Sequence, residues 1–191
     1  MTDKPTLRAR LRAERRAHVA ALPANTRALI LMRPPAPVAA RVSEGTTVGL
    51  YHATANEAPT LGYARWFQEN GRQLALPWFE SRTSPMAFRA WTDPFDLSDL
   101  EPGPMGHLQP RADAPLVSPA TVFVPLIGFT ADLHRLGQGG GHYDRWLEAH
   151  PEAVPIGLAW DVQRVDSLPH EAHDRRLAAV VTPTRIHEGE A

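Results

Sequence analysis

Two hydrophobic patterns alternate along this chain of 191 residues: short apolar runs, and longer stretches whose apolar positions have helical spacing. Short runs rich in β-branched and aromatic side chains are typical of buried strands. They predict strands over residues 46–51, 73–76, 86–91, 121–126, 154–159 and 178–182. The helical spacing predicts helices over residues 25–32, 59–70 and 143–149, and a first helix that opens at Asp3 and Pro5 and ends near Ala21.

Strands that alternate with helices favour an α/β fold. We expect a three-layer sandwich with a mostly parallel central sheet and helices on both of its faces. Residues 92–120, rich in Pro, Asp and Gly, predict a long irregular connection. No repeat or convincing boundary divides the chain, so residues 1–191 are expected to form a single domain.

Composition narrows the class of protein without identifying it. A hydrophobic content of 43% is typical of a globular chain, and a formal charge of −1 gives no overall attraction to nucleic acid or to an anionic membrane. No apolar run has the length of a transmembrane helix and no secretory signal is visible, so a cytoplasmic location is the default expectation. Since the chain has no cysteine, the sequence excludes disulfides, thiol nucleophiles and cysteine-ligated zinc.

The segment from Arg135 to Arg145 carries the strongest chemical signal. It contains residues 137–141, the glycine loop, in which four of five positions are glycine. Glycine lets backbone N–H groups approach an anion closely, and a helix that begins directly afterwards points further N–H groups at the same place. Arg135 and Arg145 add cationic donors, and Asp144 stands where a carboxylate can hold a metal beside phosphates. The segment predicts a polyphosphate site; because it matches neither the P-loop pattern nor a clean G-x-G-x-x-G motif, a plain surface loop is the alternative.

The first predicted helix is strongly basic. Six basic residues lie between Lys4 and Arg16, opposite an apolar stripe formed by Leu7, Leu11, His18 and Leu22. A solvated helix face is the favoured interpretation of such a charge run. A nucleic-acid-binding arm is less favoured, because no aromatic residues interleave for base stacking.

Glu57 follows the strand predicted over residues 46–51. Open α/β sheets bind ligands at the carboxyl ends of their strands, so this position suits a binding residue. A carboxylate that complements the dipole of the helix beginning near Pro59 is an equally good interpretation. The nine histidines show no close metal-ligand spacing.

The residues from Phe129 to Leu147 resemble the signature of the 5-formyltetrahydrofolate cyclo-ligase (methenyltetrahydrofolate synthetase) family, roughly F-D-x-x-G-x-R-L-G-x-G-x-G-Y-Y-D-R-x-L. Other segments match the family pattern in the expected order: Lys4-Pro5-Thr6-Leu7-Arg8, Asn56-Glu57-Ala58-Pro59-Thr60, Gly157-Leu158-Ala159, Gln163, Leu168-Pro169, His173-Asp174 and Val180-Val181-Thr182. The ordered set covers nearly the whole chain and is far more specific than any one motif.

This resemblance implies an enzyme that uses ATP and Mg²⁺ to cyclise 5-formyltetrahydrofolate, with or without a polyglutamate tail, to 5,10-methenyltetrahydrofolate. Glu57 and Tyr143 would bind the folate, and Arg135 and Arg145 would act on the transferred phosphoryl group. The implied ATP site consists of Lys4, Arg8, Arg135, Leu136, Gly137, Gln138, Gly139, Gly140, Gly141, His142 and Tyr143.

The resemblance also assigns Asp144 and Asp174 to Mg²⁺. A magnesium ion in proteins takes few carboxylates, several waters and substrate phosphate oxygens, which suits two acids beside a phosphate loop. Helix capping, or a surface ion pair with Arg145 or Arg175, is the alternative role for either acid.

Three positions depart from the family signature, which has Asp where this chain has Thr130, Gly at Leu133 and Tyr at His142. Because leucine does not easily adopt a positive φ, we expect residues 130–134 to follow a different path, with Asp132 returning a carboxylate to a similar place. The departures motivate a second hypothesis, a diverged family member that binds nucleotide or folate with little or no cyclo-ligase activity. A third is an enzyme of another reaction on a similar scaffold, acting on a sugar phosphate or a CoA ester.

Overall fold

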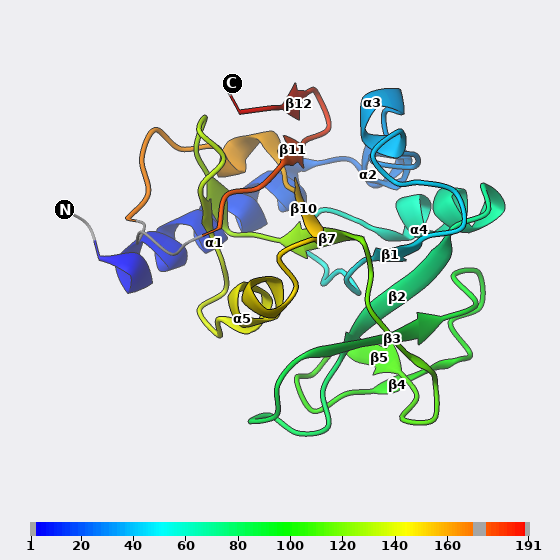
Figure 1. The fold of residues 1–191 in the computed structure, drawn as a ribbon. Helices are drawn as coiled ribbons and strands as arrows, with labels where there is room; N and C mark the ends of the chain where they lie inside the picture. Colours follow the sequence, from blue (N-terminus) through cyan, green and yellow to red (C-terminus); the bar gives the residue numbers. More distant parts are fainter. Residues whose placement is uncertain (1–2, 170–174, 190–191) are drawn as a thin grey trace.

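The computed structural model describes residues 3–169 and 175–189 (Figure 1). In this part of the chain an eight-stranded sheet has the order β12-β11-β10-β7-β1-β2-β3-β6. Its strands are β1 (Thr47–Gly49), β2 (Gln73–Trp78), β3 (Ala87–Trp91), β6 (Leu116–Val117), β7 (Thr121–Pro125), β10 (Val154–Leu158), β11 (Ala179–Val181) and β12 (Ile186–His187). The pairings from β11 to β2 are parallel, and those that add β12, β3 and β6 are antiparallel. The predicted mostly parallel sheet is confirmed.

Helices cover both faces of this sheet, because successive residues of a strand point to opposite sides. Phe123 of β7 belongs to the core cluster that holds the buried residues of α4 (Leu61–Glu69). Its neighbour Val124 belongs to a second cluster, which contains Trp146 of α5 (His142–Ala149). Figure 1 shows α5 on one side of the sheet and α4 on the other. The predicted three-layer arrangement is therefore confirmed.

The first helix, α1 (Lys4–Ala21), has the predicted bounds. The side chain of Asp3 caps it by accepting a hydrogen bond from the N–H of Thr6 at 3.0 Å. Its buried residues recur at every fourth position: Leu7, Leu11, Arg15 and Val19. The predicted stripe was right for its first two members and wrong for His18 and Leu22, which are only partly buried, because the packed row continues through Arg15.

The segment between α1 and β1 contains two short helices. The helix predicted over residues 25–32 is α2 (Ala24–Leu29), which ends early because Ile30 is extended, with ψ 136°, and Leu31 then adopts φ +56°. A second short helix, α3 (Ala36–Ala39), starts after the proline pair and was not predicted.

The prediction of an irregular connection over residues 92–120 was wrong in part. This segment includes β6 and a small antiparallel hairpin of β4 (Leu100–Pro102) and β5 (Leu108–Pro110). Both strands of this hairpin are short and end in proline, which has no N–H to donate to a further hydrogen bond between the strands. A composition typical of turns therefore did not reveal the strand pairing in this segment.

A second small hairpin, β8 (Gly128–Phe129) with β9 (Arg135–Leu136), leads into the glycine loop. The N–H of Leu133 donates to the carbonyl of Thr130 at 3.0 Å, and Leu133 itself has φ +66°. This is the geometry of a three-residue hairpin loop closed by a left-handed residue, the position that favours glycine. The expectation that Leu133 would avoid a positive φ was wrong, because the buried leucine side chain offsets the backbone strain.

The expected role of Asp132 agrees with the hairpin geometry. The hydroxyl of Thr130 donates to the Asp132 carboxylate at 2.5 Å, so the acid two residues along lies against the position where the family signature has its own acid. This contact, together with the charge of His134, lowers the pKa of Asp132, the hydrogen bond being the larger cause. The departures at 130 and 133 therefore leave the hairpin formed.

Candidate functional site

A cavity of about 530 Å³ lies at the carboxyl ends of β1, β2 and β7. Residues at or just after those strand ends line one wall: Tyr51, His52, Pro77 and Pro125. The glycine loop and the first turn of α5 line another. Since ligands of α/β sheets bind at this edge, the cavity is the candidate site.

The backbone of the glycine loop is shaped in a way that requires glycine. Gly139 has φ +110°, a backbone conformation that residues with a side chain rarely adopt. Gly141 has φ +64° and is the N-cap residue of α5. The first-turn N–H groups of α5 have no carbonyl partner within the helix and lie at the cavity. Free amides and the positive end of the helix dipole together favour an anion, as the sequence predicted.

Two arginines of α1 donate hydrogen bonds to this loop. The Nε–H of Arg8 donates to the carbonyl of Gly137 at 2.9 Å, and a Cβ built on Gly139 would lie 3.4 Å from the guanidinium carbon of Arg8. Arg12 donates from Nη2 to the backbone and side-chain oxygens of Gln138, both at 3.0 Å. The solvated-face interpretation was therefore wrong for Arg12, and Arg8 places its charge directly at the loop.

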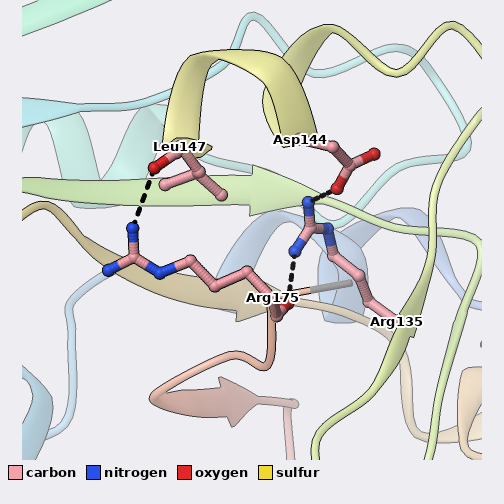
Figure 2. A network of polar contacts seen from close by, with 4 residues as sticks. All are labelled: Arg135, Asp144, Leu147 and Arg175. Atoms are coloured by element: carbon pink, nitrogen blue, oxygen red, sulfur yellow. Dashed lines mark hydrogen bonds and ion pairs between the residues drawn. The ribbon is translucent and has the colours of Figure 1, made fainter. Parts of the chain in front are cut away.

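Arg135 and Asp144 form an ion pair at the cavity rim, seen in Figure 2. Arg135 also donates from Nη1 to the carbonyl of Arg175 at 3.0 Å. The guanidinium of Arg175 donates in turn to carbonyls at and beyond the end of α5, including that of Leu147 at 3.0 Å. A cation at a helix C-terminus satisfies carbonyls that lack partners within the helix. Arg175 therefore contacts Arg135 through its carbonyl and the end of α5 through its guanidinium.

Glu57 lines the same cavity as the glycine loop and is held in one position by hydrogen bonds. Its Oε2 accepts hydrogen bonds from the N–H and the hydroxyl of Thr54 at 2.8 and 2.9 Å. Its Oε1 accepts one from the side chain of Gln138 at 3.1 Å, which links it directly to the glycine loop. The hydrogen bonds of Glu57 go to the turn and to the glycine loop, which fits a position at the cavity, while the alternative, a carboxylate that complements the dipole of the helix near Pro59, stays open.

A buried tyrosine, Tyr51, and a partly buried one, Tyr143, line the cavity together with Glu57. Burial is the largest cause that raises the pKa of Tyr51 and of Tyr143 well above its ordinary value, and the negative charge of Glu57 is the second. Both phenols are therefore protonated donors at neutral pH. The hydroxyl of Tyr51 donates to the carbonyl of Ala58 at 2.8 Å, which braces the turn that carries Glu57.

The predicted metal ligands are only partly within the described residues. Asp144 lies at the cavity rim with its side chain about half exposed, whereas Asp174 falls between residues 169 and 175, outside the part of the chain that the structure describes. Within residues 3–169 and 175–189 no group of three or more His, Asp or Glu side chains is arranged to hold a metal. One carboxylate beside a phosphate-binding loop fits Mg²⁺, which draws its other ligands from water and phosphate oxygens.

Three predicted site residues lie away from the cavity wall. The side chain of Leu136 is buried in the core beside Leu7 and Leu11. Arg145 donates to the carbonyl of Gly140 at 2.9 Å and does not line the cavity formed by the described residues. Lys4 begins α1 one turn before Arg8 and is not part of the cavity lining among the described residues.

Several lining residues were not found from the sequence. Arg15 lines the cavity although it was assigned to a solvated helix face. The segment predicted to be irregular supplies Met105, His107, Leu108 and Gln109. The position of Arg15 seven residues after Arg8, on the same helical face, was the one signal in the sequence; the hairpin residues had none.

The fold and the site are typical of α/β proteins that bind a phosphorylated ligand at the carboxyl edge of the sheet. A model of the 5-formyltetrahydrofolate cyclo-ligase family matches residues 1–183, so the chain belongs to that family. Among the described residues, no helix has the length and apolar character needed to cross a membrane.

Relatives and solved structures agree with this family. The chain is 41% identical over 86 residues to 5-formyltetrahydrofolate cyclo-ligase of Escherichia coli K12, a match that covers 42% of this chain and 47% of that protein. The Haemophilus influenzae protein of the same name is 44% identical over 55 residues, or 28% of this chain and 29% of that one. The matches thus span about half of these curated relatives or less.

Two solved structures have the same fold. The NMR structure of Aquifex aeolicus 5,10-methenyltetrahydrofolate synthetase superposes with a TM-score of 0.75 at 22% identity and covers 98% of this chain and 95% of that one. The structure of a 5,10-methenyltetrahydrofolate synthetase from Mycoplasma pneumoniae gives a TM-score of 0.66 at 21% identity, with 94% and 98% covered. At these identities the likeness shows the fold.

Proposed function

We propose that this protein catalyses the ATP-dependent cyclisation of 5-formyltetrahydrofolate to 5,10-methenyltetrahydrofolate, with release of ADP and phosphate. One observation carries the proposal: a single cavity joins an anion-binding loop to a pocket that ends at a fixed carboxylate, Glu57. A reaction between a nucleotide triphosphate and a heterocyclic substrate needs both kinds of site within contact of each other.

The nucleotide end consists of the glycine loop with the cations around it. Free amides of residues 139–143 and the guanidinium of Arg8 are suited to the phosphates of ATP. Arg135 lies at the rim beside Asp144, where a cation neutralises charge on a transferred phosphoryl group. Of the two arginines predicted to act in catalysis, Arg135 is better placed, because it lines the cavity and Arg145 does not.

The folate end consists of Glu57 and Tyr143 with an apolar wall. A carboxylate accepts hydrogen bonds from the amino and ring N–H groups of a pterin, and the raised pKa of Tyr143 keeps its hydroxyl a donor. Phe79 and Met86 supply apolar surface for the ring. A polyglutamate tail would extend from this end, and a cytoplasmic location fits a small folate substrate.

The proposed reaction mainly requires that ATP and the folate be aligned with each other. The formyl oxygen takes the terminal phosphoryl group of ATP, N10 attacks the activated carbon and loses its proton, and phosphate leaves as the ring closes. Arg135 and the loop amides would stabilise charge on the phosphoryl oxygens, so no amino-acid nucleophile is required. Mg²⁺, held by Asp144 and by Asp174, would neutralise phosphate charge in this reaction.

The experiment is a spectrophotometric assay for methenyltetrahydrofolate formed from 5-formyltetrahydrofolate, with and without Mg-ATP. We expect product only when ATP is present, with one ADP released per folate cyclised. Tight binding of ATP or folate without turnover would instead support the diverged, inactive family member, and binding of neither would overturn the proposal.

A further inference from the structure

Arg15 presents a buried cation to the cavity. Only 7% of the residue is exposed, yet it belongs to the cavity lining. Its Nη1 donates to the carbonyl of Leu126 at 3.4 Å, close to the limit for a hydrogen bond. Its Nε–H has no hydrogen-bond partner within residues 3–169 and 175–189. A buried donor without an acceptor is costly, and it is expected where a ligand supplies the acceptor.

The backbone beneath Arg15 is fixed by close packing. Leu11, one helical turn earlier, lies against Gly128 of β8, where an added Cβ would meet its Cδ1 at 2.7 Å. Leu11 also belongs to the core cluster between α1 and the β8–β9 hairpin. Because α1 cannot shift on the hairpin without losing these contacts, Arg15 is held in place before any ligand binds.

Arg15 faces the folate end of the cavity rather than the phosphate end. It follows Arg8 by seven residues, or about 10 Å along the helix axis, and Arg8 is the residue that holds the glycine loop. Burial lowers the pKa of Arg15, while the neighbouring charge of Glu57 and the phenol of Tyr51 oppose that shift. The guanidinium therefore lies within electrostatic reach of the carboxylate proposed to bind the pterin.

We propose that Arg15 is a substrate-binding residue that donates a hydrogen bond to the 4-oxo oxygen of the pterin ring. The lactam edge of that ring has an N–H donor beside a carbonyl acceptor, and Glu57 with Arg15 offers one acceptor and one donor. A ring with a 4-amino group presents an N–H donor to the same guanidinium, so Arg15 selects 4-oxo folates over their 4-amino counterparts. The inference rests on the proposed function and extends it to substrate specificity.

The experiment compares wild type, Arg15→Met, Arg15→Lys and the control Arg16→Met, an exposed neighbour on α1. Each is assayed with 5-formyltetrahydrofolate and with its 4-amino analogue, and thermal unfolding is followed for each. Arg15→Met should raise the folate KM roughly 10- to 100-fold, the usual loss for a hydrogen bond to a charged group. It should leave the ATP KM within about twofold and reduce the preference for the 4-oxo ring. Arg15→Lys should be intermediate, because it keeps the charge but not the forked donors.

The possible outcomes separate this inference from the proposed function. Active wild type with an unchanged folate KM in Arg15→Met would overturn the role of Arg15 and leave the function standing. A variant that mainly lowers kcat would place Arg15 at the phosphoryl group instead, and one with a lowered Tm and equal losses of ATP and folate affinity would make it structural. A wild type that binds no folate would remove the proposed function itself.

Discussion

At the residue scale, the arginines near the cavity differ in what each contacts. Arg8 and Arg12 donate to carbonyls of the glycine loop, and Arg135 pairs with Asp144. Arg15, on the same helix as the first two, lines the cavity and donates to the carbonyl of Leu126 instead. Arg8 and Arg15 share one face of α1, so their different contacts follow from their separation of about 10 Å along the helix axis.

The glycine loop gives the first prediction. Gly139→Val places a β-branched side chain at φ +110°, a backbone conformation that L side chains rarely adopt, so the backbone of the loop must change. We expect ATP affinity to fall at least about tenfold, equivalent to about 1.4 kcal/mol. Gly45→Val is the matched control: Gly45 also has a positive φ, +75°, with no atom within 4 Å of an added Cβ, but is not among the cavity lining. Calorimetry on both variants tests this, and equal ATP affinities would remove the loop from the site.

The two carboxylates of the cavity give the second prediction. Asp144→Asn removes the charge beside Arg135, so it should lower kcat with Mg-ATP about 10- to 1000-fold and change the folate KM little. Glu57→Gln keeps the shape but changes an acceptor into a donor, so it should mainly raise the folate KM. Steady-state kinetics with each substrate varied in turn separates the two. The same defect in both variants would contradict this division of roles.

At the element scale, the β8–β9 hairpin shows how one buried side chain outweighs backbone strain. A leucine with a positive φ costs about 1–2 kcal/mol. Removal of a buried leucine side chain costs about 2–5 kcal/mol, and Leu133 is only 3% exposed. Burial of the leucine side chain thus stabilises the hairpin by more than the positive φ destabilises it, which explains why this chain tolerates leucine where the family signature has glycine.

Stability measurements on Leu133 test that balance. Leu133→Ala loses the side chain and keeps most of the strain, whereas Leu133→Gly loses the side chain and relieves the strain. We expect both to be less stable than wild type, with the glycine variant about 1 kcal/mol more stable than the alanine variant. Denaturant unfolding gives both values. A glycine variant as stable as wild type would show that the leucine packing contributes little.

The sequence predicted the long helix better than it predicted the short hairpin strands and the contacts between elements. Helical spacing and an N-terminal cap at Asp3 located α1 correctly, because those signals are local. The β4–β5 hairpin was missed since its strands have three residues each and end in proline, so no periodic pattern exists to detect. The burial of Arg15 depends on how α1 packs against the β8–β9 hairpin, and the sequence of α1 alone does not predict that packing.

At the scale of the whole molecule, the cavity is formed by segments far apart in sequence. Gln138 and Glu57, joined by a side-chain hydrogen bond, are 81 positions apart. The sequence predicted Glu57 as a candidate because it follows a strand of the parallel sheet, and Gln138 because it belongs to the glycine loop. It could not predict their hydrogen bond, which depends on the path of the loop after β9.

The stability of the whole molecule should fall in mild acid. Burial is the largest cause that lowers the pKa of His52, His142 and His187 from the ordinary 6.5. The unfolded chain therefore binds protons more readily, so these groups reduce stability progressively as the pH falls below about 6.5. Asp3 and Asp132, whose pKa values are lowered from 3.8, add a separate loss only at lower pH.

His187 is the group through which to test this pH dependence. Its ring packs edge-on against Phe129 with centroids 4.9 Å apart, and the charges of Arg164 and Arg185 add to burial in lowering its pKa, against an opposing contribution from Asp161. We expect the Tm of wild type to decrease between about pH 7.5 and about pH 5.5, and His187→Gln to show a shallower decrease because it cannot take up that proton. Thermal unfolding across this range measures both slopes. A Tm that rises toward pH 5.5 in wild type would reverse the sign of the argument, and equal slopes would exclude His187 as a contributor.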